Sequence, residues 1–290
     1  HQEVKKEVDV EYCRAKGLPI IRREVGGGAV YLDRDQLFFQ CIFHRHRVPP
    51  RIEEAYSYFL RAPVETYRAL GIEAYYRPIN DIQVGGRKIC GSRAGQIGQA
   101  VVVVGNLIFD FNYQLMARVL KVPSEKFRDK LYSGLQEYLT TIKRELGREP
   151  PREEVKGKLI EKFAQVLGRR VEPGDLSPIE EEVLAELEAK FLSPEWAFQK
   201  GGMPKEGVKI AEGIRVVEKS HKAPGGLIRA TLRLKDQVID EVSLSGDFFF
   251  YPAEKLAELE EALKGEKLGE GILKEKVKRF LELHCVQVPR

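Results

Sequence analysis

The chain has 290 residues, of which 43% are hydrophobic and 32% are charged. This composition is that of an ordinary globular protein, and the length allows two domains, each with its own core. The formal net charge of +4 is small beside 48 basic and 44 acidic residues. The charge balance therefore gives no reason to expect a nucleic-acid partner or a membrane surface.

Four cysteines are scattered along the chain without a CxxC pair. This spacing predicts neither a zinc site nor a disulfide framework, and it favours a reducing, cytoplasmic location. The longest apolar stretch, residues 100–109, is interrupted by Gly105 and Asn106 and is too short to span a bilayer. The first residues contain no apolar signal region, so we expect no secretion signal.

Residues 1–145 alternate between strand-like and helix-like patterns. Short runs of β-branched and aromatic residues predict strands, and apolar residues at helical spacing predict a helix that packs on a sheet. The predicted strands are Ala29–Tyr31, Leu37–Phe43, Asp81–Val84 and Ala100–Phe109, and the predicted helices are Pro50–Leu70, Tyr113–Leu120 and Ser124–Thr140.

From residue 147 onward the pattern changes, because prolines and glycines separate two charged amphipathic helices. Beyond Pro204, alternating segments predict a small antiparallel sheet that is followed by a helix. We therefore expect a first domain over residues 1–202 and a smaller domain over residues 203–290. The predicted elements are helices Glu153–Leu167 and Pro178–Phe191, strands Val208–Val217, Gly226–Leu234 and Gln237–Ser245, and helix Pro252–Lys264.

Three consecutive glycines occur in the motif RREVGGGAVYLD. Gly26, Gly27 and Gly28 have no side chains, so a ligand can approach the backbone amides closely. Arg22 and Arg23 can add charge-assisted hydrogen bonds to a carboxylate or a phosphate. Taken alone, such a glycine run is equally typical of a hairpin turn with solvated arginines.

A second glycine-bearing motif, NDIQVGGRKICGS, places Lys88 between two glycine positions. A lysine is a compact point charge that can face a carboxylate and an α-phosphate together while charge builds in a transition state. Asp81 could hold a magnesium ion or a substrate hydroxyl. An isolated GGRK is more typical of a surface β-turn with a solvated lysine.

Taken together, the two motifs resemble those of the lipoate–protein ligase family. The later segments GNLIFDFNYQLMARVL, EWAF and SGDFFFYP are similar to the same family, so the resemblance covers nearly the whole chain. It implies the fold shared by biotin and lipoate ligases, an α/β (α+β) catalytic domain with a mixed or antiparallel sheet, here residues 1–202. It also implies a smaller α+β accessory domain at residues 203–290.

The resemblance further implies that ATP and Mg²⁺ serve to activate lipoate or octanoate as lipoyl-AMP. The acyl group would pass to a lysine of a lipoyl-domain acceptor, such as a dehydrogenase E2 subunit or the glycine-cleavage H protein. Lys88 would bridge the acyl carboxylate and the α-phosphate as the catalytic residue, with Asp81 near the metal. Contacts to ATP or lipoyl-AMP are implied for Arg23, Gly26, Gly27, Gly28, Ala29, Val30, Tyr31, Asn80, Asp81, Lys88, Gly91 and Ser92.

The sequence departs from the family pattern at three places. Leu32 stands where many relatives have histidine, and Val103 and Val104 replace a common pair of histidines. Relatives also begin with a strand, a helix and another strand before the residue that matches Gln2, and we expect those elements to be missing here. These departures put a role of histidine in doubt but leave Lys88 in place.

Three other functions stay open. An octanoyltransferase would pass the acyl group through a cysteine thioester without ATP, but Cys90 fits a buried packing residue better. A biotin ligase would carry a GRGRxG-type loop, which the sequence lacks. A non-catalytic lipoyl-binding protein would bind the acid without forming an adenylate.

The remaining motifs are interpreted as structural. His44 and His46 have no third ligand nearby in the sequence, so we expect no metal site there. His221 lies next to a proline–glycine segment that predicts a turn. We expect the Phe248–Phe250 run to lie in a core or at a domain interface, and Trp196 to anchor the packing between domains.

Overall fold

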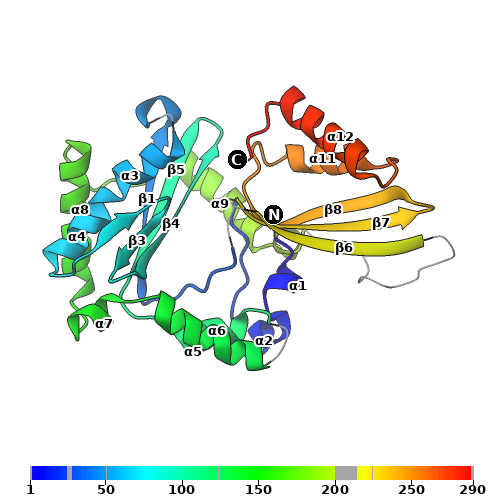
Figure 1. Ribbon diagram of the computed structural model, residues 1–290. Helices are drawn as coiled ribbons and strands as arrows, with labels where there is room; N and C mark the ends of the chain where they lie inside the picture. The colour runs from blue at the N-terminus through cyan, green and yellow to red at the C-terminus, as the bar shows by residue number, and fades with distance from the viewer. Residues whose placement is uncertain are drawn as a thin grey trace. The chain divides into compact units, whose positions relative to one another are not determined.

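The computed structural model describes residues 2–24, 28–49, 51–122, 125–199, 214–223 and 225–288. Two compact units make up the chain. Residues 30–186 form the central unit, and residues 1–29 together with 187–290 form the terminal unit (Figure 1). The predicted domain boundary between residues 202 and 203 lies outside the described residues and stays a prediction.

A five-stranded sheet forms the core of the central unit, with strand order β1-β5-β4-β3-β2. Every neighbouring pair is antiparallel, where a mixed or antiparallel sheet was predicted for the first domain. Strand β1 runs beside β5 in an unbroken register from Gln36↔Ile108 to His44↔Ala100. The five strands are β1 (Gln36–His44), β2 (Tyr75–Arg77), β3 (Asp81–Val84), β4 (Arg87–Ile97) and β5 (Ala100–Ile108).

The inner face of this sheet packs on three helices, α3 (Ile52–Phe59), α4 (Arg61–Ala69) and α8 (Arg152–Leu167). Phe39 shows how tight this packing is, because a Cβ added to Gly105 would lie 2.4 Å from its Cζ atom. Only glycine fits beneath that ring. Side chains that alternate along β1 and β5 supply the apolar contacts, since successive residues of a strand point to opposite faces. They are Phe39, Cys41, Val103 and Leu107.

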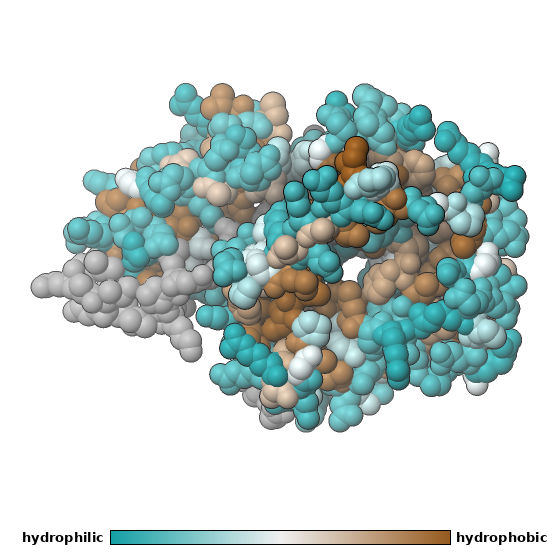
Figure 2. All heavy atoms as spheres, turned by 180° about the vertical axis from the view of Figure 1, so that it is seen from behind, coloured by the Kyte–Doolittle hydropathy of each residue, from teal (hydrophilic) through white to brown (hydrophobic). Residues whose placement is uncertain are grey.

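The opposite, outer face carries a strip of apolar side chains that the central unit leaves partly open. Phe38 is 42% exposed and Ile42 is 60% exposed, although both are large hydrophobic residues. The register places Ile42 beside Val102 and Gln40 beside Val104. We call Phe38, Ile42, Ile97, Val102 and Val104 the outer strip. Figure 2 shows that hydrophobic residues gather in places on an otherwise largely hydrophilic face of the molecule.

Shorter elements complete the central unit. A 3-10 turn η1 (Arg45–Arg47) follows β1, and α5 (Tyr113–Val119), α6 (Glu125–Tyr138) and α7 (Ile142–Leu146) follow β5. Side chains cap two of these helices, since Asn112 accepts from Leu115 N and Thr141 accepts from Arg144 N.

The terminal unit contains a three-stranded antiparallel sheet with strand order β6-β7-β8, which we call the C-terminal sheet. Alternation along β7 sends Leu232 and Leu234 into a core with the helices α11 and α12, and sends Arg229 and Thr231 to the other face. The elements are β6 (Ile214–Ala223), β7 (Gly226–Lys235), β8 (Val238–Phe248), α11 (Lys255–Leu263) and α12 (Glu270–Leu283).

Four more helices are α1 (Val4–Glu7), α2 (Val10–Ala15), α9 (Pro178–Leu192) and α10 (Pro194–Ala197). Asp9 caps α2 by accepting from Tyr12 N, and Ser193 caps α10 by accepting from Trp196 N. No helix within the described ranges combines the length and the apolar composition needed to cross a membrane.

Most predicted elements are confirmed, including the antiparallel pattern of the second domain and the apolar face of the helix that follows it. Leu256, Leu259 and Leu263 of α11 are all buried. The prediction of a strand at Ala29–Tyr31 was wrong, because this segment has no regular secondary structure. His221 was predicted in a turn but lies within β6, paired with Ile228.

Two further predictions need correction. The single helix expected over residues 50–70 is two helices that meet at Leu60, which caps both. The glycine-rich segment between the predicted strands is itself strand β4, which the sequence did not predict. Glycine weakens a strand and hides its alternation, so pattern alone missed it.

Candidate active site

Lys88 lies two residues after the tight turn that joins β3 to β4. Gly85 and Gly86 form this turn with φ angles of +53° and +82°. Two consecutive positive φ values are typical of a type I′ hairpin turn, which side-chain-bearing residues rarely adopt. The first glycine pair of the motif therefore shapes the hairpin that carries Lys88.

The side chain of Lys88 lies across the backbone of Gly91. A Cβ added to Gly91 would stand 3.3 Å from Lys88 Cε and 3.6 Å from Nζ, so any larger residue would push the lysine away. Lys88 is also fixed through its backbone, because its carbonyl accepts a hydrogen bond of 2.8 Å from Thr140 N. The lysine is 21% exposed and therefore not the freely solvated residue typical of an isolated turn.

The ammonium group of Lys88 forms an ion pair with Asp81, at 2.6 Å from Nζ to Oδ1. Asp81 is its only ionic or hydrogen-bonding partner in the part of the chain that the structure describes. An ammonium group has three N–H donors. Lys88 thus keeps donors that a ligand can fill, in a partly buried position where each such bond is stronger than in water.

Asp81 is engaged at both carboxylate oxygens. Oδ1 faces Lys88, and Oδ2 accepts a hydrogen bond of 3.3 Å from the Tyr138 hydroxyl. Burial and the neighbouring Asp81 both raise the pKa of Tyr138, so this hydroxyl keeps its proton at neutral pH. The described residues contain no cluster of three side chains suited to a metal ion. Asp81 is thus held by Lys88 and Tyr138, and its role near a metal ion stays a prediction.

A chain of hydrogen bonds runs from the AVY segment to the backbone beneath Lys88. Gln36 Nε2 donates to the Tyr31 carbonyl at 3.2 Å, and Asn106 Nδ2 donates to Gln36 Oε1 at 2.8 Å. Gly91 N then donates to Asn106 Oδ1 at 2.9 Å. Buried polar groups persist only when they are hydrogen-bonded, so this network fixes Tyr31 relative to Gly91.

Sequence reasoning missed Gln36, Asn106 and Tyr138. Both Gln36 and Asn106 are buried. Asn106 interrupts the apolar run of β5, which was the available signal, whereas Gln36 is the first residue of β1 and gave none. Tyr138 reaches Asp81 from the end of α6, a contact that no local pattern could show.

Asn80 and Ser92 hold the start of β3 against β4. Asn80 Nδ2 donates to the Ser92 carbonyl at 2.7 Å, and Ser92 Oγ donates to the Asn80 carbonyl at 2.6 Å. This reciprocal pair is structural. A contact of either residue with a ligand stays a prediction.

Tyr31 is partly buried, with its ring edge-on to Phe111 at 6.2 Å between centroids. Burial and the nearby carboxylates of Asp33 and Asp35 raise the pKa of Tyr31 to about 12. Its hydroxyl is therefore neutral and can act as a hydrogen-bond donor but not as a base at neutral pH. Val30 is exposed beside it.

Both cysteines of the central unit are buried, which makes their thiols poor nucleophiles. Cys90 is fully buried, and burial raises the pKa of its thiol to about 12. Cys41 is also buried, with its pKa raised to about 12 by the same cause. Because the thiolate is the nucleophile, neither residue suits an acyl-thioester intermediate. The expectation that Cys90 is a packing residue is confirmed.

Arg22, Arg23 and Gly28 belong to the terminal unit, whereas Lys88 belongs to the central unit. Gly26 and Gly27 lie outside the described residues. Arg23 Nη2 donates to the Gly28 carbonyl at 2.9 Å. Ala29 ends the terminal unit, and Val30 begins the central one. The candidate ligand contacts are thus divided between the two units.

The remaining motifs are structural where the structure describes them. Trp196 Nε1 donates to the Arg22 carbonyl at 2.8 Å, and its ring lies under the Lys190 ammonium at 4.1 Å. His44 and His46 stack at 5.0 Å between centroids. Phe248 and Phe250 are buried in the core of the C-terminal sheet, whereas Phe249, between them, is exposed.

Comparison with known families identifies the chain. Residues 1–164 match the model of the lipoyl protein ligase A/B catalytic domain, and residues 216–284 match that of the bacterial lipoate protein ligase C-terminus. The chain belongs to the lipoyl protein ligase A/B family. Its C-terminal sheet with α11 and α12 is accordingly the family's C-terminal domain.

Relatives of two activities resemble this family member. It is 29% identical over 222 residues to octanoyltransferase LipM of Kyrpidia tusciae, which covers 69% of this chain and 81% of the relative. It is 24% identical over 287 residues to lipoate-protein ligase LplJ of Bacillus subtilis, covering 94% and 78%. The protein is therefore an enzyme of the lipoate ligase and octanoyltransferase family.

Solved structures agree with the fold. The bi-partite lipoate protein ligase of Thermoplasma acidophilum, studied with its E2 lipoyl domain, matches with a TM-score of 0.63 and 28% identity, covering 71% of this chain and 80% of that one. A lipoate-protein ligase A bound with ATP matches with a TM-score of 0.58 and 24% identity, covering 68% and 78%. The predicted lipoate-ligase fold with antiparallel sheets and a smaller C-terminal domain is confirmed.

Proposed function

We propose that this enzyme is an ATP-dependent lipoate–protein ligase, which activates lipoate or octanoate as an acyl adenylate and transfers the acyl group to a lysine of a lipoyl-domain protein. One observation carries the proposal. A lysine with unfilled N–H donors lies at one end of the sheet face that carries the apolar outer strip.

The geometry of the outer face suits an acid with an apolar tail. Gly91 and Asn106, beside Lys88, share that face with Phe38 at one end of the outer strip. Ile42 and Val102 lie further along it, in line with Ile97. A carboxylate that fills the donors of Lys88 can direct an alkyl chain along these side chains, where burial of each CH₂ group contributes about 0.8 kcal/mol.

The chemistry then follows two steps that need no protein nucleophile. A carboxylate oxygen attacks the α-phosphorus of ATP, the bond to pyrophosphate breaks, and acyl-AMP forms. The ε-amine of the acceptor lysine then attacks the acyl carbon, loses a proton, and releases AMP. Lys88 holds the carboxylate and stabilises the charge that builds on the α-phosphate, an electrostatic role suited to a fixed cation in a water-poor site.

A second cation lies on the same face. Arg93 projects from β4 beside Val104, two residues beyond Gly91, and it is exposed. It has no acidic partner among the described residues. We assign Arg93 to phosphate binding. Arg23, Gly26, Gly27, Gly28, Ala29, Val30, Tyr31, Asn80 and Ser92 remain proposed contacts of the adenylate.

We propose ATP and a lipoyl-domain acceptor as substrates by analogy with two proteins of similar structure. A lipoate-protein ligase A of the same fold binds ATP, and the Thermoplasma enzyme was studied with an E2 lipoyl domain. Magnesium would accompany the nucleotide, because Mg²⁺ is commonly bound through substrate phosphates with only one or two carboxylates. No step here depends on a protein ligand to that ion.

The rival function is an octanoyltransferase, which the relatives named LipM favour. It requires a reactive cysteine, whereas Cys41 and Cys90 are buried with raised pKa values. The match of residues 216–284 to a ligase C-terminus also favours the ligase.

Pyrophosphate release tests the proposal. Purified enzyme with ATP is given lipoate, octanoate or biotin, each with and without a lipoyl domain. The ligase predicts release with lipoate or octanoate, even without the acceptor, and none with biotin. Transfer from an octanoyl thioester without ATP would instead show the transferase, and the absence of both reactions would leave a binding protein.

A further inference from the structure

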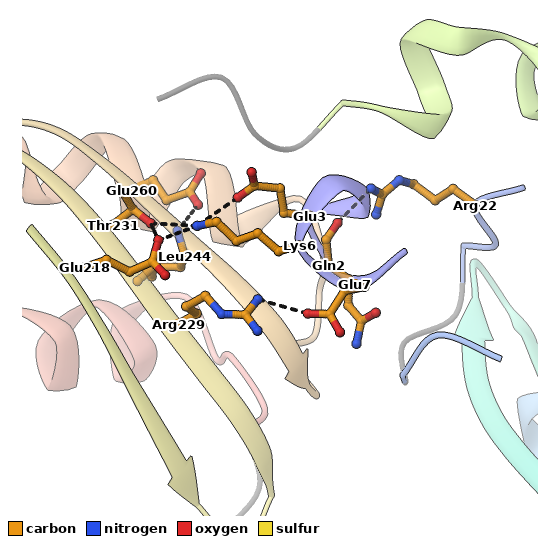
Figure 3. A network of polar contacts seen from close by, with 10 residues as sticks. All are labelled: Gln2, Glu3, Lys6, Glu7, Arg22, Glu218, Arg229, Thr231, Leu244 and Glu260. Atoms are coloured by element: carbon orange, nitrogen blue, oxygen red, sulfur yellow. Dashed lines mark hydrogen bonds and ion pairs between the residues drawn. The ribbon is translucent and has the colours of Figure 1, made fainter. Parts of the chain in front are cut away.

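Helix α1 lies on the C-terminal sheet, and Lys6 is its principal contact. Lys6 Nζ forms ion pairs with Glu3, at 3.1 Å, and with Glu218 of β6, and it donates to Thr231 Oγ1 of β7 at 3.5 Å (Figure 3). Three acceptors fill the three donors of this ammonium group. Unlike Lys88, Lys6 has no donor left for a ligand.

A second ion pair lies beside the first. Arg229 Nη1 of β7 meets Glu7 Oε1 at 2.9 Å, and both side chains are mostly buried, with exposures of 14% and 21%. Lys6 and Glu7 are adjacent in α1, and both reach the same sheet face (Figure 3).

The face that receives α1 is the one that points away from α11 and α12. Glu218 lies opposite Thr231 in the register of β6 and β7, and Arg229 is two residues from Thr231 on the same side of β7. Leu232 and Leu234, on the other side of β7, pack with the helices. Charged residues thus gather where α1 binds. These charges complement those of α1, which also buries the side chain of Val4.

Arg22, near the other end of the N-terminal segment, also forms hydrogen bonds within the terminal unit. Arg22 donates to the Ala197 carbonyl at 3.0 Å through Nε and to the Gln2 carbonyl at 2.7 Å through Nη2. A Cβ on Gly28 would stand 3.5 Å from Asp247 Oδ2 at the end of β8. The N-terminal segment is therefore held at Lys6, Glu7 and Arg22 by residues from 197 onward, and Gly28 lies close to the end of β8.

We propose that Lys6–Glu218 and Glu7–Arg229 form a latch through which the C-terminal sheet positions Arg23 and Gly28 for nucleotide. This inference rests on the proposed function, because it takes these two residues as nucleotide contacts. The four latch residues are positioning residues that do not touch substrate. The C-terminal domain thereby acts on ATP binding through the first residues of the chain.

Charge reversal and charge swap test the latch. Lys6→Glu and Glu218→Lys each place like charges together, and the double variant restores the pair with its polarity reversed. Arg233→Glu is the matched control. Arg233 lies on the same face of β7 but pairs with Asp240 and Glu241 and does not touch α1.

Two measurements distinguish a loss of the latch contacts from a loss of enzymatic activity. Hydrogen exchange of the amides of residues 10–16 reports whether the N-terminal segment is held, whatever the enzyme does. Steady-state pyrophosphate release reports KM for ATP and kcat. Each single reversal is expected to speed exchange and to raise KM for ATP by about five- to tenfold, with kcat changed less than about threefold. The double variant is expected to restore both, and Arg233→Glu to change neither.

The outcomes are distinct. Unchanged exchange in both single variants would overturn the latch. Faster exchange with an unchanged KM for ATP would overturn its positioning role. Should the wild-type protein release no pyrophosphate with any acid, the proposed function fails and the positioning role with it, while exchange still reports whether α1 is held.

Discussion

Two lysine–carboxylate pairs of this protein differ in how many N–H donors of the ammonium group are filled. Lys6 is surrounded by Glu3, Glu218 and Thr231, which fill its donors. Lys88 has Asp81 alone among the described residues, and its side chain lies over the bare backbone of Gly91. The exposures of the two lysine side chains are similar, at 28% and 21%.

The two lysines differ in how many of their three N–H donors have a partner in the protein, and not in how deeply they are buried. A saturated ammonium gains nothing from a ligand and serves to hold two segments together. An unsaturated one binds a ligand carboxylate without losing its present partner. Residue type and exposure are therefore alike in the two lysines, and the number of filled donors is what distinguishes Lys88, the proposed ligand contact, from Lys6.

The largest expected effect is the loss of Lys88. Lys88→Ala should leave the fold intact and lower acid-dependent pyrophosphate release by on the order of 10²–10³-fold, because a single preorganised electrostatic contact is worth that much in a dry site. Lys143→Ala is the matched control, since Lys143 forms an exposed pair with Asp110 at 2.5 Å. Equal activity of the two variants would remove Lys88 from the mechanism.

A smaller effect is expected at the far part of the outer strip. Ile42→Asp places a charge beside Val102, so an acyl chain can no longer lie there without desolvating a carboxylate. KM for octanoate should rise by roughly tenfold or more, while KM for ATP stays unchanged. The control is Ile160→Asp, at an exposed apolar position of α8. Comparable KM values for octanoate in the two variants would show that the acyl chain does not lie along the outer strip.

The latch should contribute to stability in a pH-dependent way. Burial would raise the pKa of Glu218, but hydrogen bonds from Lys6 and Thr231 and the charge of Arg229 outweigh it, so the pKa is lowered. Glu3 is the other carboxylate near Lys6. A lowered pKa stabilises the fold at neutral pH, and this stabilisation is lost as the pH falls below the ordinary glutamate range and through the lowered value.

Thermal unfolding of Glu218→Gln against the wild type checks this. At neutral pH the variant should unfold a few degrees lower, for a difference on the order of 1 kcal/mol. The difference in unfolding temperature between variant and wild type should shrink as the pH is lowered. A difference that is constant with pH would show that the charge of the Glu218 carboxylate does not cause the stabilisation.

The smallest effect is expected at Cys90. Cys90→Ala removes a buried thiol with a pKa of about 12, so pyrophosphate release and acyl transfer should change less than about twofold. Stability should fall by about 1 kcal/mol for the small cavity. Abolished acyl transfer in a folded Cys90→Ala protein would instead favour the transferase.

Much of the fold was accessible from local pattern. β5 follows a run of apolar residues, β3 follows an alternation of polar and apolar residues, and the face of α11 follows the spacing of Leu256, Leu259 and Leu263. Strand β4 was not accessible, because Gly91 and Gly95 interrupt its alternation. Gly91 is the residue that makes room for Lys88, so the feature that hides the strand also builds the site.

The site was accessible only in part. Lys88 and Asp81 were found through a family resemblance, and the structure brings them together. Gln36, Asn106 and Tyr138 come from three distant elements, and their meeting depends on strand register and helix placement. The latch likewise joins residues more than two hundred positions apart, a pairing that no local rule could supply.

One isotope measurement tests the central claim most directly. Octanoate labelled with oxygen-18 in its carboxyl group is turned over with ATP and a lipoyl domain, and the products are analysed by mass spectrometry. If the carboxylate beside Lys88 attacks the α-phosphorus, AMP must carry one labelled oxygen and the octanoylated acceptor must keep the other. Octanoylated acceptor formed alongside unlabelled AMP, or without ATP, would contradict the account.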